Sequence, residues 1–159
     1  MNKRIVIKKI IAKLTGELEV YFRAAEYARA EATHEQNKAE HKYDTRGLEA
    51  SYLARGQSRQ AAEIESAIAE FQKLNARKFA ADEPINVGAL VQVEAMGENS
   101  FYFIGTRAGG TEVEHDDKEI LVITPQSPLG EQLMGKKVGE NLSLTLGGAK
   151  QAGRVVKVE

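Results

Sequence analysis

Two stretches of this sequence repeat apolar or small residues at alternating intervals of four and three positions. In the first stretch these residues are Leu14, Leu18, Tyr21, Ala25, Ala28 and Ala32, and in the second they are Gly47, Ala50, Ala54, Gln57, Ala61, Ile64, Ile68 and Phe71. The spacing is the a/d pattern of a coiled coil, in which one seam of each helix faces its partner. Two such helices joined by a short polar turn predict an antiparallel α-helical hairpin.

The seam changes in size along the predicted hairpin. Leucine, isoleucine and phenylalanine lie at the end away from the turn, whereas alanines lie toward the turn. Small seam residues let helices approach closely, so we expect a thin arm, and about 30 residues from Leu14 to Asp44 give a length on the order of 45 Å. Such an arm is either a spacer or dimerisation element with a solvated turn, or a probe that reaches into a partner.

After residue 80 the pattern changes to short runs rich in Val, Ile, Phe and Tyr. These runs are residues 89–95, 100–106, 119–125, 142–146 and 154–159. They predict a small antiparallel sheet. Ser127 and Pro128 predict the N-cap and first residue of a short helix that stops at Gly135. We therefore expect an α+β chain, with a coiled-coil hairpin in residues 1–80 and a β domain with one short helix in residues 81–159.

Composition excludes several classes of function. A formal net charge of -1 gives no bulk attraction to nucleic acid or to an acidic membrane. The absence of cysteine excludes disulfides, thiol nucleophiles and cysteine-ligated zinc, and it fits a cytoplasmic protein. No segment approaches the roughly 20 apolar residues of a membrane helix, so we expect no membrane partner. The glycine pairs at 109–110 and 147–148 lack the spacing of phosphate-binding loops and predict hairpin turns.

The polar turn of the hairpin contains a pair of acidic residues. Glu40 and Asp44 are four positions apart and are flanked by Lys42 and Arg46. Two carboxylates held close together repel each other, and Mg²⁺ would relieve that repulsion. Alone they would bind Mg²⁺ weakly, but they could complete the shell of an ion that a partner already holds. The same spacing is that of an ordinary surface pair compensated by basic neighbours, and spacing alone leaves both interpretations open.

Two stretches resemble the Gre family of bacterial transcript-cleavage factors. They are YDTRGLEASYLARGQSRQAAEIESAIAEF in the hairpin and ITPQSPLGEQLMGKKVGE in the sheet half. The second resembles the carboxy-terminal signature of the family, an Ile-x-x-x-Ser-Pro run followed by a small helix and a Gly-Lys-Lys-Val-Gly turn. The likeness extends from about residue 14 to the end of the sequence, and it is closer still to a branch with a KYDTRGLEASYLA segment.

The resemblance implies an FKBP-like fold for the sheet half, docked at the rim of the secondary channel of RNA polymerase. Ser127, Pro128, Lys136 and Lys137 are then the expected partner-binding residues. The hairpin would enter the channel, where acidic residues at its end help hold a second Mg²⁺ and activate a water, so that polymerase cuts the 3′ end of a backtracked transcript. Basic residues of the hairpin would contact that nascent RNA. The protein would be a monomeric cytoplasmic cofactor of polymerase, not an enzyme by itself, and would bind no Mg²⁺ tightly alone.

The acidic pair of the family is an Asp followed three residues later by a Glu. Alignment of the second helices places Glu40 at the first acidic position and Tyr43 at the second, with Asp44 one residue beyond. We predict that Glu40 and Asp44 are the catalytic and metal-binding residues, with Glu35 a candidate under a shifted register. Because Tyr43 stands where an acid is expected, the alternative is a channel regulator that modulates initiation or pausing without promoting cleavage. A third hypothesis, a prolyl isomerase or chaperone with a coiled-coil spacer, follows only from the FKBP-like sheet.

Overall fold

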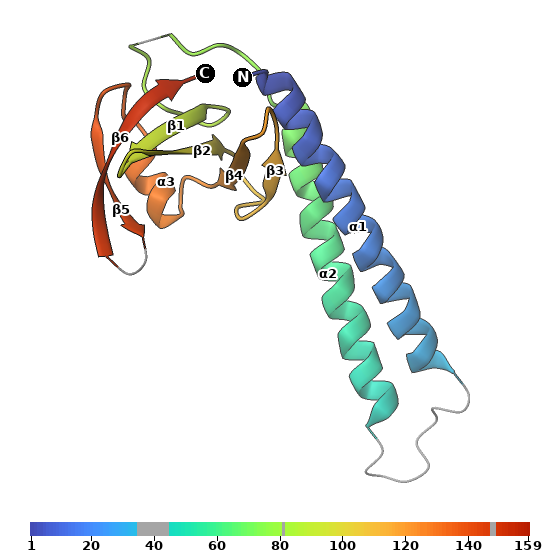
Figure 1. The fold of residues 1–159 in the computed structure, drawn as a ribbon. Helices are drawn as coiled ribbons and strands as arrows, with labels where there is room; N and C mark the ends of the chain where they lie inside the picture. The colour runs from blue at the N-terminus through green and yellow to red at the C-terminus, as the bar shows by residue number, and fades with distance from the viewer. Residues whose placement is uncertain (35–44, 81, 147–148) are drawn as a thin grey trace. The chain divides into compact units, whose positions relative to one another are not determined.

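The computed structural model describes residues 1–34, 45–80, 82–146 and 149–159 (Figure 1). Its elements are α1 (Lys3–Thr33), α2 (Arg46–Lys73), β1 (Leu90–Ala95), β2 (Glu98–Ile104), β3 (Glu112–Glu114), β4 (Glu119–Ile123), α3 (Pro128–Leu133), β5 (Asn141–Leu146) and β6 (Ala149–Val158). The predicted α+β class, with a helical hairpin followed by a sheet and a short helix, is confirmed.

The chain forms two compact units. The hairpin unit contains residues 12–69, and the sheet unit contains residues 1–11 together with residues 70–159. The division between the units therefore falls inside α1, after residue 11, and inside α2, after residue 69. The domain boundary expected from the sequence, between residues 80 and 81, marks a change of sequence pattern, and it stays a prediction.

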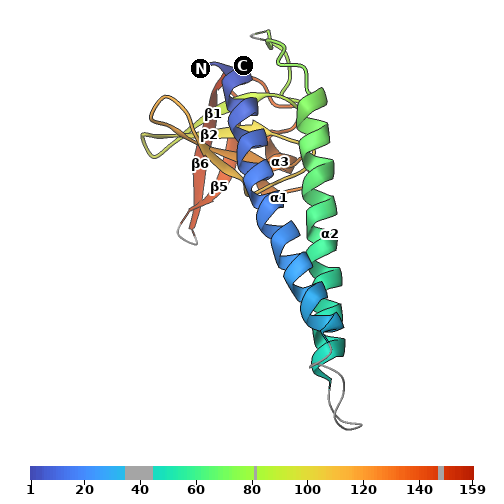
Figure 2. The same cartoon turned by 90° about the vertical axis from the view of Figure 1, so that its right-hand side faces the viewer.

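In the hairpin unit α1 and α2 lie side by side and run in opposite directions (Figures 1 and 2). Every predicted seam position is buried or half-buried. Ala25 and Ala28 of α1 are 5% and 2% exposed, and Ala61 of α2 is 1% exposed. The spacing of the sequence therefore identified the faces through which the two helices pack.

Helix α1 begins at Lys3, well before the first predicted seam residue. The reason is that Val6 and Ile10 continue the four-residue spacing back from Leu14, and both are fully buried. Lys8 and Lys9 interrupt the apolar run in the sequence, but both are exposed and so lie away from the buried face. This segment belongs to the sheet unit, where its apolar face is covered.

Among the described residues, six strands form one sheet in the order β3-β4-β2-β1-β6-β5. The pairs β1–β2, β1–β6, β5–β6 and β3–β4 are antiparallel, so most of the sheet is antiparallel as expected. Strands β2 and β4 are parallel, which corrects the expectation of a wholly antiparallel sheet. The cause is β3, which was not among the strand runs predicted from the sequence; only Val113 of its three residues is buried. This extra strand reverses the chain once more, so β4 returns in the direction of β2.

Helix α3 has the start predicted from its sequence. Ser127 is its N-cap, with the Ser127 hydroxyl oxygen accepting a hydrogen bond of 3.0 Å from the Gly130 N–H, and Pro128 is its first residue. Gly130 faces the preceding loop so closely that a Cβ there would overlap the Thr124 carbonyl oxygen and lie 2.8 Å from its carbon. Leu133 is fully buried in the core below the helix.

The base of α2 packs on the sheet through an aromatic contact. The ring centroids of Phe71 and Phe103 are 5.9 Å apart, and both side chains are almost fully buried. A Cβ on Gly105 would lie 2.9 Å from the end of the Phe71 ring. Glycine at this position therefore leaves the space that the ring occupies.

Polar contacts fix the same turn of α2 to the loop after β2. The Glu70 carboxylate accepts hydrogen bonds from the Thr106 hydroxyl and, at 2.8 Å, from Arg107 Nε. The bond from Thr106 and the bond from Arg107 together hold the pKa of Glu70 below its ordinary value. The carboxylate is thus charged in its contact with Arg107 near neutral pH.

A buried lysine fixes the base of α1. Lys3 is 7% exposed; its ammonium donates to the Arg77 carbonyl and lies 4.8 Å from the centroid of the Phe79 ring. The Arg77 guanidinium lies on the same ring at 4.1 Å and pairs with Glu83 at 2.5 Å. Burial and, next, the charge of Arg77 lower the pKa of Lys3 to about 8.

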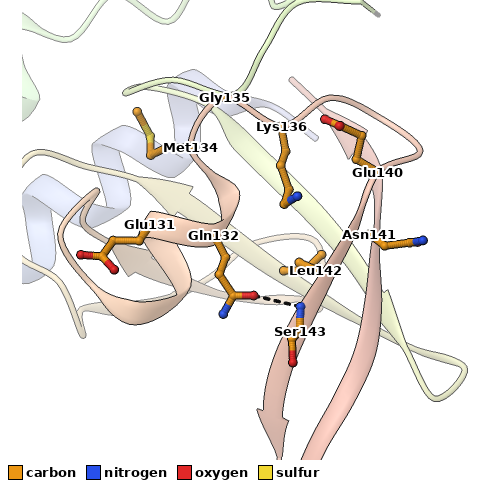
Figure 3. Close-up of a pocket in the computed structure, with 9 residues that line it drawn as sticks. All are labelled: Glu131, Gln132, Met134, Gly135, Lys136, Glu140, Asn141, Leu142 and Ser143. Carbon is orange, nitrogen blue, oxygen red and sulfur yellow. Dashed lines mark hydrogen bonds between the residues drawn. The ribbon is translucent and has the colours of Figure 1, made fainter.

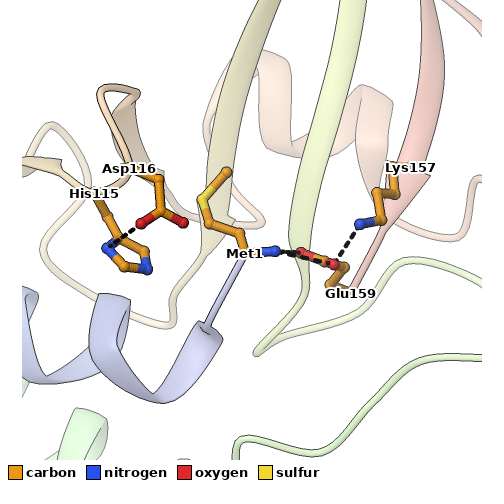
Figure 4. A network of polar contacts seen from close by, with 5 residues as sticks. All are labelled: Met1, His115, Asp116, Lys157 and Glu159. Atoms are coloured by element: carbon orange, nitrogen blue, oxygen red, sulfur yellow. Dashed lines mark hydrogen bonds and ion pairs between the residues drawn. The ribbon is translucent and has the colours of Figure 1, made fainter.

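The first and last residues of the sequence also meet in the sheet unit (Figure 4). The Met1 amine lies 3.1 Å from the Glu159 carboxylate, which also pairs with Lys157 at 2.5 Å. In the same view His115 Nδ1 lies 3.4 Å from Asp116, and the ring is buried at the β3–β4 turn. The start of α1 is thus joined to the end of β6 by charged groups.

We predict that Gly130→Ala destabilises the sheet unit by about 3 kcal/mol or more, because the added methyl group overlaps main-chain atoms that cannot rotate away. Gly16→Ala is the matched control, since a Cβ on Gly16 would meet nothing within 4 Å. The control should gain about 0.5 to 1 kcal/mol from better helix propensity. Urea denaturation measures both, and equal stability of the two variants would contradict the described packing of α3.

We also predict a pH-dependent contribution from Lys3. Between about pH 8 and the ordinary lysine pKa of 10.5, the unfolded chain holds this proton and the folded chain releases it, so folding stability rises with pH in that window. Below about pH 8 both states are protonated and the penalty of burying the charge is fully present. The difference in unfolding free energy, wild type minus Lys3→Met, should therefore increase from about pH 8 to 10.5. A difference that stays flat across this range in urea titrations would refute the assignment.

Candidate partner-binding surface

The four predicted partner-binding residues lie on one continuous segment, from the start of α3 to the turn after it. Pro128 and Lys137 are exposed, and Lys136 is half-buried. The Ser127 hydroxyl donates to the Thr124 carbonyl at 2.8 Å while it caps α3. Ser127 therefore shapes this surface from within, and the other three residues present atoms to the outside.

The turn that contains the two lysines has a well-supported main chain. The Gly135 N–H donates to the Ile85 carbonyl at 2.9 Å, and the Ile85 N–H donates to the Lys136 carbonyl at 2.7 Å. The Lys137 N–H donates to the Glu140 carboxylate at 2.6 Å. In these bonds Lys136 and Lys137 use only their main-chain atoms. Both ammonium groups are therefore left for contacts outside the turn.

A hollow of about 730 Å³ lies between α3 and β5 (Figure 3). Its lining residues are Glu131, Gln132, Met134, Gly135, Lys136, Glu140, Asn141, Leu142 and Ser143. The lining combines the carboxylates of Glu131 and Glu140 and the Lys136 ammonium with the half-buried Met134 and the buried Leu142. An open hollow with this mixture of charged and apolar side chains suits contact with another protein surface better than enclosure of a small ligand.

A side-chain hydrogen bond links α3 to the sheet edge beside this hollow. The Ser143 N–H of β5 donates to Gln132 Oε1 at 2.9 Å (Figure 3). Strand β5 is the last strand of the sheet, so this N–H points away from β6 and is met by a carboxamide in place of another strand. Sequence reasoning missed Gln132, since the two residues are separated by 11 positions and no local pattern connects them.

The predicted catalytic and metal-binding residues, Glu40 and Asp44, lie in residues 35–44, outside the described residues. Tyr43 and Glu35 lie there too. On the described side, the Thr45 hydroxyl donates to the Glu49 carboxylate at 2.8 Å as α2 begins. Across the described ranges no three His, Asp or Glu side chains gather as a metal site would require. The metal assignment therefore stays a prediction.

Residues 81–159 match the family described as "Transcription elongation factor, GreA/GreB, C-term". Among solved structures, the chain is similar to GreA factor homolog 1 (Gfh1) of Thermus thermophilus, with 25% identity, a TM-score of 0.40 and 94% of each chain covered. It is also similar to Gfh1 of Thermus aquaticus, with 25% identity, a TM-score of 0.41, and 95% of this chain and 94% of that chain covered. For GreA/GreB of Nitrosomonas europaea the identity is 16% and the TM-score 0.39, over 60% of this chain and 78% of that chain. No curated protein matches the sequence.

The matched segment contains α3, the lysine turn and the strands of the described sheet. In the parts of the chain that the structure describes, no helix is long and apolar enough to cross a membrane. Through its carboxy-terminal domain the chain belongs to the GreA/GreB family of transcription elongation factors.

Proposed function

We propose that this protein binds RNA polymerase at its secondary channel and stimulates the polymerase's own cleavage of backtracked transcripts. The observation that carries the proposal is the GreA/GreB match of residues 81–159 in a chain that also folds a long antiparallel helical hairpin. The protein acts as a cofactor of polymerase and performs no reaction alone. The decisive test is transcript cleavage by stalled, backtracked polymerase across a Mg²⁺ titration, with and without the protein.

In this proposal the two units have separate tasks. The surface of Pro128, Lys136 and Lys137 beside the hollow docks on the polymerase. The hairpin reaches the catalytic centre, and the 31 residues of α1 correspond to about 46 Å of helix. A seam with many alanines supports this use, because closely packed helices make an arm narrow enough for a channel.

The chemical task falls to Glu40 and Asp44. The two carboxylates would hold a second Mg²⁺ together with groups of the polymerase, since carboxylate oxygens are the ligands that this ion prefers. The ion would supply Lewis-acid activation of a water for hydrolysis of the phosphodiester bond. Glu40 and Asp44 would also orient that water toward the transcript.

A second candidate function is a channel regulator that modulates initiation or pausing without promoting cleavage. Tyr43 favours it, because a phenol stands at the second acidic position of the family alignment and a neutral phenol is a poor ligand for Mg²⁺. The protein would then bind polymerase and leave the cleavage rate unchanged at every Mg²⁺ concentration.

We predict that replacing Glu40 and Asp44 together with Ala lowers stimulated cleavage by about a hundredfold, because both carboxylates that this protein would contribute to the second Mg²⁺ are lost. Binding to polymerase should stay within about twofold of the wild type, since the docking surface is elsewhere. The matched control is Glu26→Ala with Glu65→Ala, which removes two exposed carboxylates from other positions of the hairpin. Undiminished cleavage by the Glu40/Asp44 variant would exclude the catalytic assignment.

We predict that Lys136→Glu combined with Lys137→Glu weakens polymerase binding by about tenfold and reduces its dependence on salt. The variant should keep its fold, because the turn is held by hydrogen bonds to the main-chain atoms of Lys136 and Lys137, and their side chains make none of these bonds. Lys78→Glu is a control for charge, since Lys78 is exposed on a different segment. Fluorescence anisotropy of labelled protein with core polymerase measures the affinity, and a loss equal to that of the control would argue against this docking surface.

A further inference from the structure

The hollow beside the proposed docking surface contains one of the few sulfur atoms of the chain. The sequence has no cysteine, and its three methionines are Met1, Met96 and Met134. Met134 lines the hollow between α3 and β5 (Figure 3). Methionine adapts its shape readily to a partner and is enriched at protein interfaces, but peroxides convert its thioether to a sulfoxide. Oxidation of this chain at sulfur therefore falls on methionine alone.

Met134 lies at the boundary between the hollow and the core of the sheet unit. Its side chain is half-buried and packs against the hydrophobic core from one side, while it lines the hollow on the other. Its main chain is fixed, since the Met134 N–H donates to the Gly130 carbonyl and the Gly135 N–H donates to the Ile85 carbonyl, both at 2.9 Å. A chemical change at the sulfur would therefore leave the end of α3 in place.

A sulfoxide at Met134 would act differently on the free and the docked protein. In the free protein the new oxygen can face the open hollow and stay hydrated. In the docked protein the polymerase covers the hollow, and a polar oxygen buried there without a hydrogen-bond donor is unfavourable. If the Lys136 ammonium donated to this oxygen, it would be withdrawn from its own contact with the polymerase. Either arrangement weakens docking and leaves the fold intact.

Met96 provides a contrast within the same unit. It is 73% exposed in the turn between β1 and β2, and the hollow is lined by other residues. Because the Met96 sulfur is the more accessible of the two, it should be oxidised at least as fast as that of Met134. Its oxidation changes an exposed turn and not the proposed docking surface. Met96 thus reports that the oxidant has acted, without an expected effect on binding.

We propose that Met134 is a reversible oxidation site through which hydrogen peroxide weakens docking of this protein on RNA polymerase. This inference rests on the proposed function and adds a regulation of its docking surface. A lone pair of the thioether sulfur attacks one peroxide oxygen and the O–O bond breaks. The proton of the transferred oxygen leaves with the departing hydroxide as water. The sulfur loses two electrons and the peroxide gains them, and methionine sulfoxide reductases reverse the change with a thiol as reductant.

The test treats the full-length protein with hydrogen peroxide and removes the peroxide with catalase before core polymerase is added. Peptide mass spectrometry measures the sulfoxide at each methionine, and fluorescence anisotropy measures binding. Once Met134 is oxidised we expect binding about tenfold weaker than in the untreated sample, with an unchanged melting temperature. Treatment with both sulfoxide reductases should restore the affinity, because each reduces one epimer of the sulfoxide.

Three variants locate the effect, each compared with its own untreated sample. Met134→Leu replaces the thioether by an apolar side chain of similar size, so its affinity should not change on treatment although Met96 is oxidised. Met96→Leu is the matched control and should lose affinity on treatment as the wild type does. Met134→Gln places a polar group on an unbranched side chain, so without peroxide it should bind about tenfold more weakly than the untreated wild type.

The other outcomes overturn the proposal in distinguishable ways. If Met134 is oxidised and binding is unchanged, or if Met134 stays reduced while Met96 is fully oxidised, the oxidation proposal fails and the proposed function stands. An equal loss of affinity in treated Met134→Leu would place the effect at another residue. A lowered melting temperature of the oxidised wild type would assign the loss to unfolding. If the untreated wild type does not bind core polymerase, the proposed function fails and the oxidation proposal fails with it.

Discussion

The contact of Phe71 with Phe103, over the bare backbone of Gly105, is the one on which the rest of the structure depends. It joins the last turn of α2 to β2, one of the two middle strands of the described sheet, and no larger residue fits at position 105 without moving the ring or the neighbouring main chain. The paired charges of Glu70 and Arg107 lie directly beside it. The apolar contact therefore fixes where the last turn of α2 lies on the sheet. The polar bonds of Glu70 fix the rotation of that turn about the helix axis.

The base of α1 is held by a different balance of forces. Lys3 is buried as a cation between an aromatic ring and a carbonyl, so part of the gain from the contact is offset by loss of hydration. Val6 and Ile10 supply the apolar burial that makes this arrangement possible. Both long helices thus begin or end in a mixed apolar and charged anchor within the sheet unit. In the described part of the hairpin unit, the two helices pack through the seam.

The sequence was most informative where a local rule decides the structure. The seam followed from alternating spacing, and the start of α3 followed from Ser127 and Pro128, because helix periodicity and capping depend on residues a few positions apart. Strand β3 was not predictable, since its three residues, with one buried valine between two exposed glutamates, are too short for an alternation that could be recognised. The start of β6 was missed for a related reason, because Ala149 to Gly153 have the composition of a turn.

The candidate site divides in the same way. The lysine turn was predicted from a short motif, and the structure places it beside the hollow. The bond from Ser143 to Gln132 and the aromatic setting of Lys3 could not be predicted, because both depend on tertiary contacts between distant residues. In the sequence, Gln132 and Lys3 look like ordinary surface residues. Contacts between single polar side chains and residues far away in the sequence are therefore the part of the site that local sequence rules cannot predict.

The alanines of the seam keep the hairpin narrow, but they also limit its stability. Any change that fills the seam, such as a leucine at Ala28 or Ala61, would bury more apolar area and also push the helix axes apart. Substitutions that raise the thermal stability of the hairpin through the seam would thus make it wider. A narrow hairpin, in contrast, has only weak packing between its two helices. In a hairpin of this kind, additional stability has to come from the contacts at the helix bases, around Phe71 and Lys3. Larger side chains there do not change the distance between the helices along the rest of the hairpin.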